Sequence, residues 1–144
     1  MPVSLIPASD TYPLRLKVLR PGGTLADTHF DSDLIEGSFH MGLYLDGRIV
    51  VVASFHPRSH PALGGEAAYQ LRGMATDPAH AGKGHGSTLL QAALEELKRR
   101  SARLLWCNAR IMAVPFYQRH GLVTEGPEFE IPGIGRHCLM WRGV

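Results

Sequence analysis

The stretch QLRGMATDPAHAGKGHGSTLLQAALEEL, residues 70–97, decides the fold of this chain. It starts as an apolar, strand-like run and then reaches a turn with three glycines at alternate positions, Gly82, Gly84 and Gly86. Leucines and alanines recur at helical spacing after the turn. The stretch therefore predicts a strand, a glycine-rich turn and a helix in direct succession.

The glycine-rich turn is suited to hold a phosphate group. Glycine lets a ligand approach the backbone without meeting a Cβ atom, and the first N–H groups of a helix have no partner within it. A tight connection without a ligand is the alternative. A P-loop is excluded because Gly84, rather than Ser or Thr, follows Lys83. A dinucleotide-binding turn is excluded because Ser87 or Leu89 stands where its third glycine belongs.

The rest of the chain alternates between strand-like and helical patterns. The predicted elements are a helix over 12–20, a loop over 24–36, strands over 38–45, 48–55 and 66–76, a helix over 84–100, a strand over 103–109, a helix over 112–121, and strands over 122–131 and 136–143. Asp46-Gly47 between the first two strands predicts a hairpin. No linker divides the chain, so residues 1–144 are expected to form a single α+β domain with a mixed, mostly antiparallel sheet.

The helix over 84–100 carries the clearest periodic pattern. Its apolar face is predicted from Leu90, Ala93, Leu94 and Leu97. Its exposed face is predicted to carry ion pairs four residues apart, Glu95 with Arg99 and Glu96 with Arg100.

Composition limits the classes of function. Hydrophobic residues make up 44% and charged residues 19% of the chain, which is typical of a globular protein. The net charge of +2, without a block of lysine and arginine, predicts no nucleic-acid partner. No apolar run has the length of a membrane span, and the first residues lack a signal-peptide pattern. The two distant cysteines, Cys107 and Cys138, favour a reduced, cytoplasmic protein.

Two motifs carry a family resemblance. The first is Leu71, Met74, Thr76 and Pro78, followed by Ala81-Gly82-Lys83-Gly84-His85-Gly86; the second is Ala113, Phe116, Tyr117, Gly121 and Leu122. Because of these motifs, the chain from about residue 37 onward resembles the GNAT-type N-acetyltransferases, which use acetyl-coenzyme A (acetyl-CoA). The resemblance implies a three-layer α/β/α fold. It also implies adjacent parallel strands through Met74 and Trp106 that splay apart at the acetyl-CoA site.

The resemblance also implies roles for individual residues. It places the pantetheine arm beside Met74, Ala75 and Thr76, and the pyrophosphate on Ala81, Gly82, Lys83, Gly84, His85, Gly86 and Ser87. It adds Asn108, Arg110 and Phe116 to the cofactor-binding residues. Tyr117 holds the position of the family's general acid, which protonates the thiolate after an acceptor amine attacks acetyl-CoA directly in a ternary complex. The alternative is that Tyr117 is a core residue.

The chain departs from the family pattern in three places. Ala81 replaces the usual Arg or Gln at the start of the loop. Arg110 stands where Asn is common, with Asn108 close by, and it either meets a cofactor phosphate or is solvated. The region before the hairpin is short, so the usual pair of N-terminal helices, which often shapes the acceptor site, is expected to be trimmed.

Several questions stay open at the level of sequence. The general base is one of Glu66, Glu128, Glu130, His56 and His137, or a chain of waters; His137 is of most interest because it follows a tight turn. No metal site is predicted. The amine acceptor and the oligomeric state, a homodimer included, are undetermined. A non-catalytic acyl-CoA-binding module and, more remotely, a thiol hydrolase using Cys107 are alternatives to the enzyme.

Overall fold

The computed structural model describes residues 2–144, which form one seven-stranded sheet in the order β1-β2-β3-β4-β5-β7-β6. All neighbouring strands are antiparallel except β4 and β5, which are parallel. This confirms the predicted α+β class and the mixed, mostly antiparallel sheet. The strands are β1 (Val3–Ile6), β2 (Phe39–Leu45), β3 (Arg48–Pro57), β4 (Ala68–Thr76), β5 (Leu104–Arg110), β6 (Val123–Ile131) and β7 (Gly135–Gly143).

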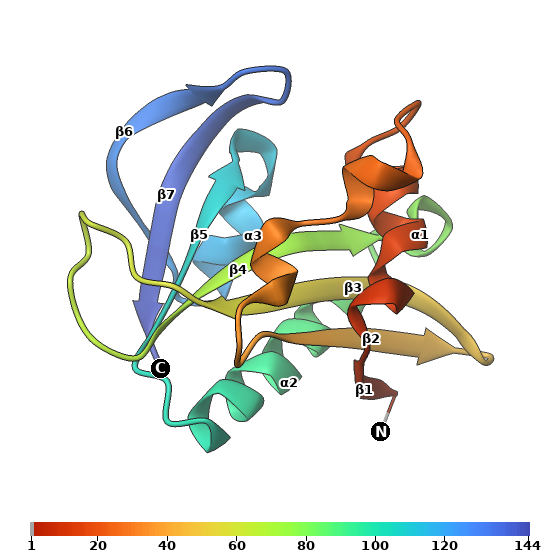
Figure 1. The fold of residues 1–144 in the computed structure, drawn as a ribbon, viewed down its shortest axis with the longest axis horizontal. Coiled ribbons are helices and arrows are strands. Elements are labelled where there is room, and N and C mark those ends of the chain that lie inside the picture. Colours follow the sequence, from red (N-terminus) through yellow and green to blue (C-terminus); the bar gives the residue numbers. More distant parts are fainter. Residues whose placement is uncertain (1) are drawn as a thin grey trace.

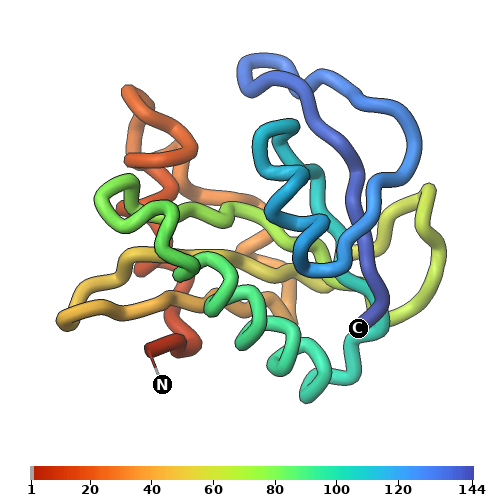
Figure 2. Tube along the Cα trace, turned by 180° about the vertical axis from the view of Figure 1, so that it is seen from behind, coloured from red at the N-terminus to blue at the C-terminus, as the bar shows by residue number. Residues whose placement is uncertain are grey.

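Helices cover both faces of the sheet. The α-helices are α1 (Tyr12–Leu14), which continues as a π-helical turn over Arg15–Leu19, α2 (His85–Arg99) and α3 (Val114–Arg119). In Figure 1, α1 and the short turns after it lie in front of the sheet, and α2 lies behind it. Figure 2 shows from the reverse side how α2 runs across the strands. Among residues 2–144, no helix is long and apolar enough to cross a membrane.

The face under α2 and α3 is the apolar core. Leu90, Ala93, Leu94 and Leu97 are all buried, as the helical periodicity predicts. The predicted pair of Glu96 with Arg100 is confirmed at 2.8 Å between Oε2 and Nε. The predicted pair of Glu95 with Arg99 is wrong, because Arg99 turns to Glu96 instead, at 2.7 Å.

The N-terminal third differs most from the sequence-based prediction. Strand β1 was not expected; it has only four residues and pairs with β2 at the edge of the sheet. The expected loop over 24–36 contains two 3₁₀ turns, Leu25–Thr28 and Asp31–Leu34. The side chain of an aspartate accepts a backbone N–H at each turn: Asp27 from Thr24 and Asp33 from Phe30. Such local hydrogen bonds stabilise turns that apolar periodicity cannot reveal.

Beneath these turns lies a buried polar cluster centred on Arg15. The fully buried guanidinium donates to both carboxylate oxygens of Asp33, at 2.7 and 3.0 Å, and to Ser54 Oγ at 2.7 Å. His40 and His56 extend the cluster: His40 Nδ1 lies 2.7 Å from Ser54 Oγ, and His56 Nε2 lies 3.8 Å from Asp33 Oδ1. Burial opposes ionisation of Asp33, but Arg15 outweighs it and holds the pKa of Asp33 below its ordinary value. The cluster fixes the N-terminal turns to the sheet.

Candidate active site

The parallel strands β4 and β5 separate where the motif strand approaches the glycine turn. Their pairing covers only Ala68 with Leu104, Tyr69 with Leu105 and Gln70 with Trp106. Beyond Gln70, the edge of β4 that faces β5 has no partner strand among residues 2–144. The predicted adjacent, splayed pair is therefore confirmed. The gap exposes backbone groups of β4 to a ligand that can pair like an extra strand.

A β-bulge sharpens the separation at Gly73. Val52 of β3 pairs with Ala75 and Ser54 pairs with Arg72, so Gly73 and Met74 together face one residue of β3. Gly73 has a φ of +64°, which a glycine adopts without strain. The bulge turns this part of β4 out of the regular ladder at the position where the two strands part.

The predicted pyrophosphate loop follows β4 and the short 3₁₀ turn Pro78–His80, and it leads into α2. Gly82 and Gly84 have φ angles of +75° and +82°, and a Cβ atom at either would meet no atom within 4 Å. In residues 2–144, none of the backbone N–H groups of residues 82–87 has a protein acceptor. This row of free donors at the positive end of a helix fits a pyrophosphate group.

Four further residues predicted to bind the cofactor lie in three places: beside the loop, on β4 and on β5. Phe116 lies beside the loop: a Cβ at Gly86 would sit 3.5 Å from its ring and 3.5 Å from the Met74 methyl group. The Ala75 side chain is buried with Ile6 and Leu14 away from the gap, so only its backbone could meet a cofactor. Exposed Asn108 and Arg110 lie on β5 and line the cleft described below.

Tyr117 reaches the gap from α3. It is buried, with 7% of its surface exposed, and its hydroxyl oxygen lies 3.8 Å from the sulfur of Met74. Burial, and to a smaller degree the nearby Cys107 thiol, raises the pKa of Tyr117 well above its ordinary value. The phenol is therefore protonated at neutral pH and can donate a proton or a hydrogen bond into the gap.

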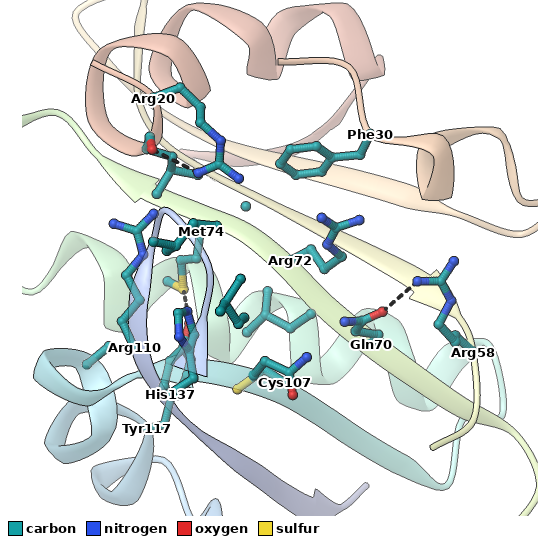
Figure 3. Close-up of a pocket in the computed structure, with 18 residues that line it drawn as sticks. Arg20, Phe30, Arg58, Gln70, Arg72, Met74, Cys107, Arg110, Tyr117 and His137 are labelled. Carbon is teal, nitrogen blue, oxygen red and sulfur yellow. Dashed lines mark hydrogen bonds between the residues drawn. The ribbon is translucent and has the colours of Figure 1, made fainter. Parts of the chain in front are cut away.

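A cleft of about 450 Å³ opens from the gap toward the N-terminal turns. Its lining includes Met74, Tyr117 and, from neighbouring elements, Phe30, Gln70 and His137. Figure 3 shows four arginines around the cleft: Arg20, Arg58, Arg72 and Arg110. The sequence interpretation named only Arg110 of these. Arg72, a charged residue inside a strand that is otherwise uncharged and next to a glycine, was the one signal that could have pointed to the others.

Of the predicted base candidates, His137 alone lines this cleft. It is buried, and its Nδ1 lies 2.8 Å from the carbonyl oxygen of Gly135. A proton on Nδ1 satisfies that carbonyl and leaves the lone pair on Nε2. Glu66, Glu128 and Glu130 are exposed elsewhere. His56 belongs to the Arg15 cluster, where burial lowers its pKa to about 4.

Cys107 lies on the core side of β5 and does not fit a thiol hydrolase. It is buried, and burial raises the pKa of the Cys107 thiol to about 12. A thiol of this kind stays protonated at neutral pH and is a poor nucleophile. Cys107 packs in the apolar core as a small side chain, and its neighbour Trp106 packs on the opposite face of the sheet.

Comparison with known proteins identifies a family. A family model described as the acetyltransferase (GNAT) family matches residues 11–122. The uncharacterized N-acetyltransferase YitI of Bacillus subtilis (strain 168) is 39% identical over 140 residues, covering 97% of this chain and 94% of YitI.

Solved structures share the fold at low identity. Escherichia coli ElaA superposes with a TM-score of 0.78 at 18% identity, over 97% of each chain. An aminoglycoside 6′-N-acetyltransferase complexed with coenzyme A has a TM-score of 0.73 at 10% identity, over 99% of this chain and 97% of that one. With the family model matching most of the chain and YitI well above 30% identity, the chain belongs to the GNAT family of acetyl-CoA-dependent N-acetyltransferases.

Proposed function

We propose that this protein transfers an acetyl group from acetyl-CoA to an amine by direct attack, with both substrates bound at once. The observation that carries the proposal is the combination of two features: the backbone N–H groups of residues 82–87 lack protein acceptors among residues 2–144, and the edge of β4 at Met74 lacks a partner strand there. A pyrophosphate on the loop and a pantetheine arm along β4 would bring a thioester to the bulge. The acceptor would enter from the cleft on the other side.

The proposed transfer needs a base for the amine and a hydrogen-bond donor for the oxyanion. An alkylammonium titrates near ~10, so the amine must lose a proton before it attacks. His137 Nε2 is the proposed base, because it lines the cleft and the Gly135 carbonyl holds the proton on Nδ1. The backbone N–H of Met74, outside the β3 ladder, is proposed to stabilise the oxyanion.

Tyr117 is proposed as the general acid. Its neutral phenol lies beside Met74, where the sulfur of the thioester would arrive. Proton donation to the departing thiolate completes the step: the C–S bond breaks, the C–N bond forms, and the proton passes from Tyr117 to sulfur. The ammonium loses two protons in all: His137 passes the first to solvent before the attack, and the second, released from nitrogen as the intermediate collapses, restores the phenol of Tyr117.

The test combines kinetics with mass measurement. Thiol release from acetyl-CoA would be followed with a panel of amines, and initial rates at varied concentrations of both substrates should give intersecting double-reciprocal lines. The intact protein incubated with acetyl-CoA alone should gain no acetyl mass. Parallel lines with an acetylated protein would replace direct attack with a covalent route. Tight acetyl-CoA binding without turnover on any amine would instead favour an acyl-CoA-binding module.

A further inference from the structure

The cleft beside the bulge is rich in arginine, and carboxylates line only the adjoining hollow, where Asp27 and Asp31 lie with Arg20, Arg58 and Arg72. Four of its lining residues are arginines, and none is aspartate or glutamate. Among residues 2–144, none of the four forms an ion pair with a carboxylate. The other residues that line the cleft are His137 and uncharged side chains. The arginines in question are Arg20, Arg58, Arg72 and Arg110.

The side chain of Arg72 is held by contacts with Phe30 and Ser32. Its guanidinium lies 4.3 Å from the centre of the Phe30 ring, and Nη1 donates to the buried Ser32 Oγ at 3.0 Å. The guanidinium of Arg15 lies 3.8 Å from the centre of the same ring. Arg15 forms an ion pair with Asp33, whereas Arg72, which lines the cleft, forms no ion pair among residues 2–144. The stacking and the hydrogen bond fix the direction of Arg72 and leave its remaining N–H groups for another acceptor.

The neighbouring arginines raise the electrostatic cost of leaving this site without an anion. Arg58 donates to Gln70 Oε1 at 3.2 Å and lines both the cleft and the adjoining hollow with Arg72 (Figure 3). Burial first, and then the charges of Arg58 and Arg15, lower the pKa of Arg72, and the charge of Asp33 offsets this lowering only in part. Burial, followed by the charge of Arg20, lowers the pKa of Arg110. A bound anion would relieve this repulsion.

The phosphates of the cofactor are poorly placed to be that anion. The free amides of residues 82–87 come after the end of β4, while Arg72 lies before the bulge. At about 3.3 Å per residue, Arg72 is roughly 13 Å along the strand from Thr76. Arg58 and Gln70 lie further in the same direction, at the end where β4 still pairs with β5. The position is that of an acceptor substrate whose amine reaches the bulge.

Building on the proposed function, we infer that the acetyl acceptor is an amine that also carries a carboxylate or phosphate group. Arg72 and Arg58 bind this anionic group, and they thereby direct the amine toward the bulge. Planar guanidinium groups suit either anion, because both offer paired oxygens for two parallel N–H donors.

The test measures binding, so that it does not depend on turnover. The protein saturated with coenzyme A would be titrated by calorimetry with two matched pairs of probes: O-phosphoethanolamine against ethanolamine, and glycine against glycinamide. Each anionic probe should bind at least about tenfold more tightly than its partner, the scale of one charge-assisted contact. The preferred pair separates phosphate from carboxylate recognition.

Variants identify the residues that bind the anion. Arg72→Gln and Arg58→Gln should each weaken the anionic probes about tenfold or more, while the affinity for coenzyme A stays within about twofold. Arg72→Lys should recover part of the loss, since it keeps the charge. Arg99→Gln on the exposed side of α2 is the matched control and should change neither affinity.

Three results would overturn the inference: equal binding of neutral and anionic probes, retained binding in both Gln variants, or no binding of any probe at millimolar concentration. Failure of coenzyme A itself to bind would count against the proposed function alone. The arginine site would then be judged from the same titrations without coenzyme A.

Discussion

The two faces of the sheet are built on different principles. The face under α2 and α3 is closed by leucine, alanine and phenylalanine packing, and its burial needs no specific partner. The face under the N-terminal turns buries a charged arginine, an aspartate and two histidines, which are stable only as a complete set. A substitution on the apolar face removes only its own contacts, whereas a substitution in the polar cluster leaves other buried polar groups without partners. The candidate active-site cleft lies where the two meet, at the gap between β4 and β5.

The largest expected effect breaks the charged face. Asp33→Ala leaves Arg15 buried without a counter-ion, and it should lower the free energy of unfolding by about 3–5 kcal/mol. Urea denaturation followed by circular dichroism measures the loss. The double variant Arg15→Met with Asp33→Leu removes both charges and should lose less. Equal losses in the single and double variants would mean that the ion pair itself, and not an orphaned charge, matters.

The second prediction distinguishes the two faces by how the free energy of unfolding depends on pH. Burial holds the pKa of His56 at about 4, below its ordinary 6.5, so the unfolded chain binds the proton more readily. The stability contributed by neutral His56 is present above pH 6.5 and declines as pH falls to about 4. The decline should reach about 3 kcal/mol. In His56→Asn, the free energy of unfolding should depend less on pH across this range. In Leu97→Ala, on the apolar face, it should fall by a similar amount at every pH.

The third effect concerns Tyr117, the side chain of the apolar face that is proposed to act as the general acid. Tyr117→Phe keeps the ring in the core and removes only the hydroxyl, so stability should change by about 1 kcal/mol or less. Turnover should fall roughly 10²-fold or more if the phenol protonates the thiolate. Steady-state rates with an accepted amine decide the matter. Near-normal turnover combined with a large loss of stability would make Tyr117 a core residue.

The smallest effect tests the helix start on the apolar side. His85→Asp puts a negative charge in the first turn of α2, which stabilises the helix slightly but repels a pyrophosphate. Acetyl-CoA should bind about tenfold more weakly, while the melting temperature of the free protein stays the same or rises. His85→Asn is the neutral control. Unchanged affinity in the Asp variant would move the pyrophosphate away from this loop.

The apolar face and the gap could be read from sequence, and the charged face could not. Helical periodicity identified Leu90 and Leu97 because burial there depends only on spacing along one helix. The β4–β5 gap was predicted only through the family resemblance that the two motifs carry, because the strands that form it are far apart in the chain. The contact between Arg15 and Asp33 joins segments 18 residues apart in the chain, through turns without periodicity. Nothing local specifies such a pair, nor the stacking of Arg72 on Phe30.

The strand order has a consequence for how the chain folds. β7 lies between β5 and β6, and it pairs with β5 along the whole of that strand, whereas β4 pairs with β5 over three positions. Until Gly135–Gly143 has been synthesised, β5 is an edge strand with an almost free row of backbone donors and acceptors. Such an edge can pair with another chain and aggregate. Chaperone dependence during synthesis should therefore be greatest between the completion of α3 and the insertion of β7.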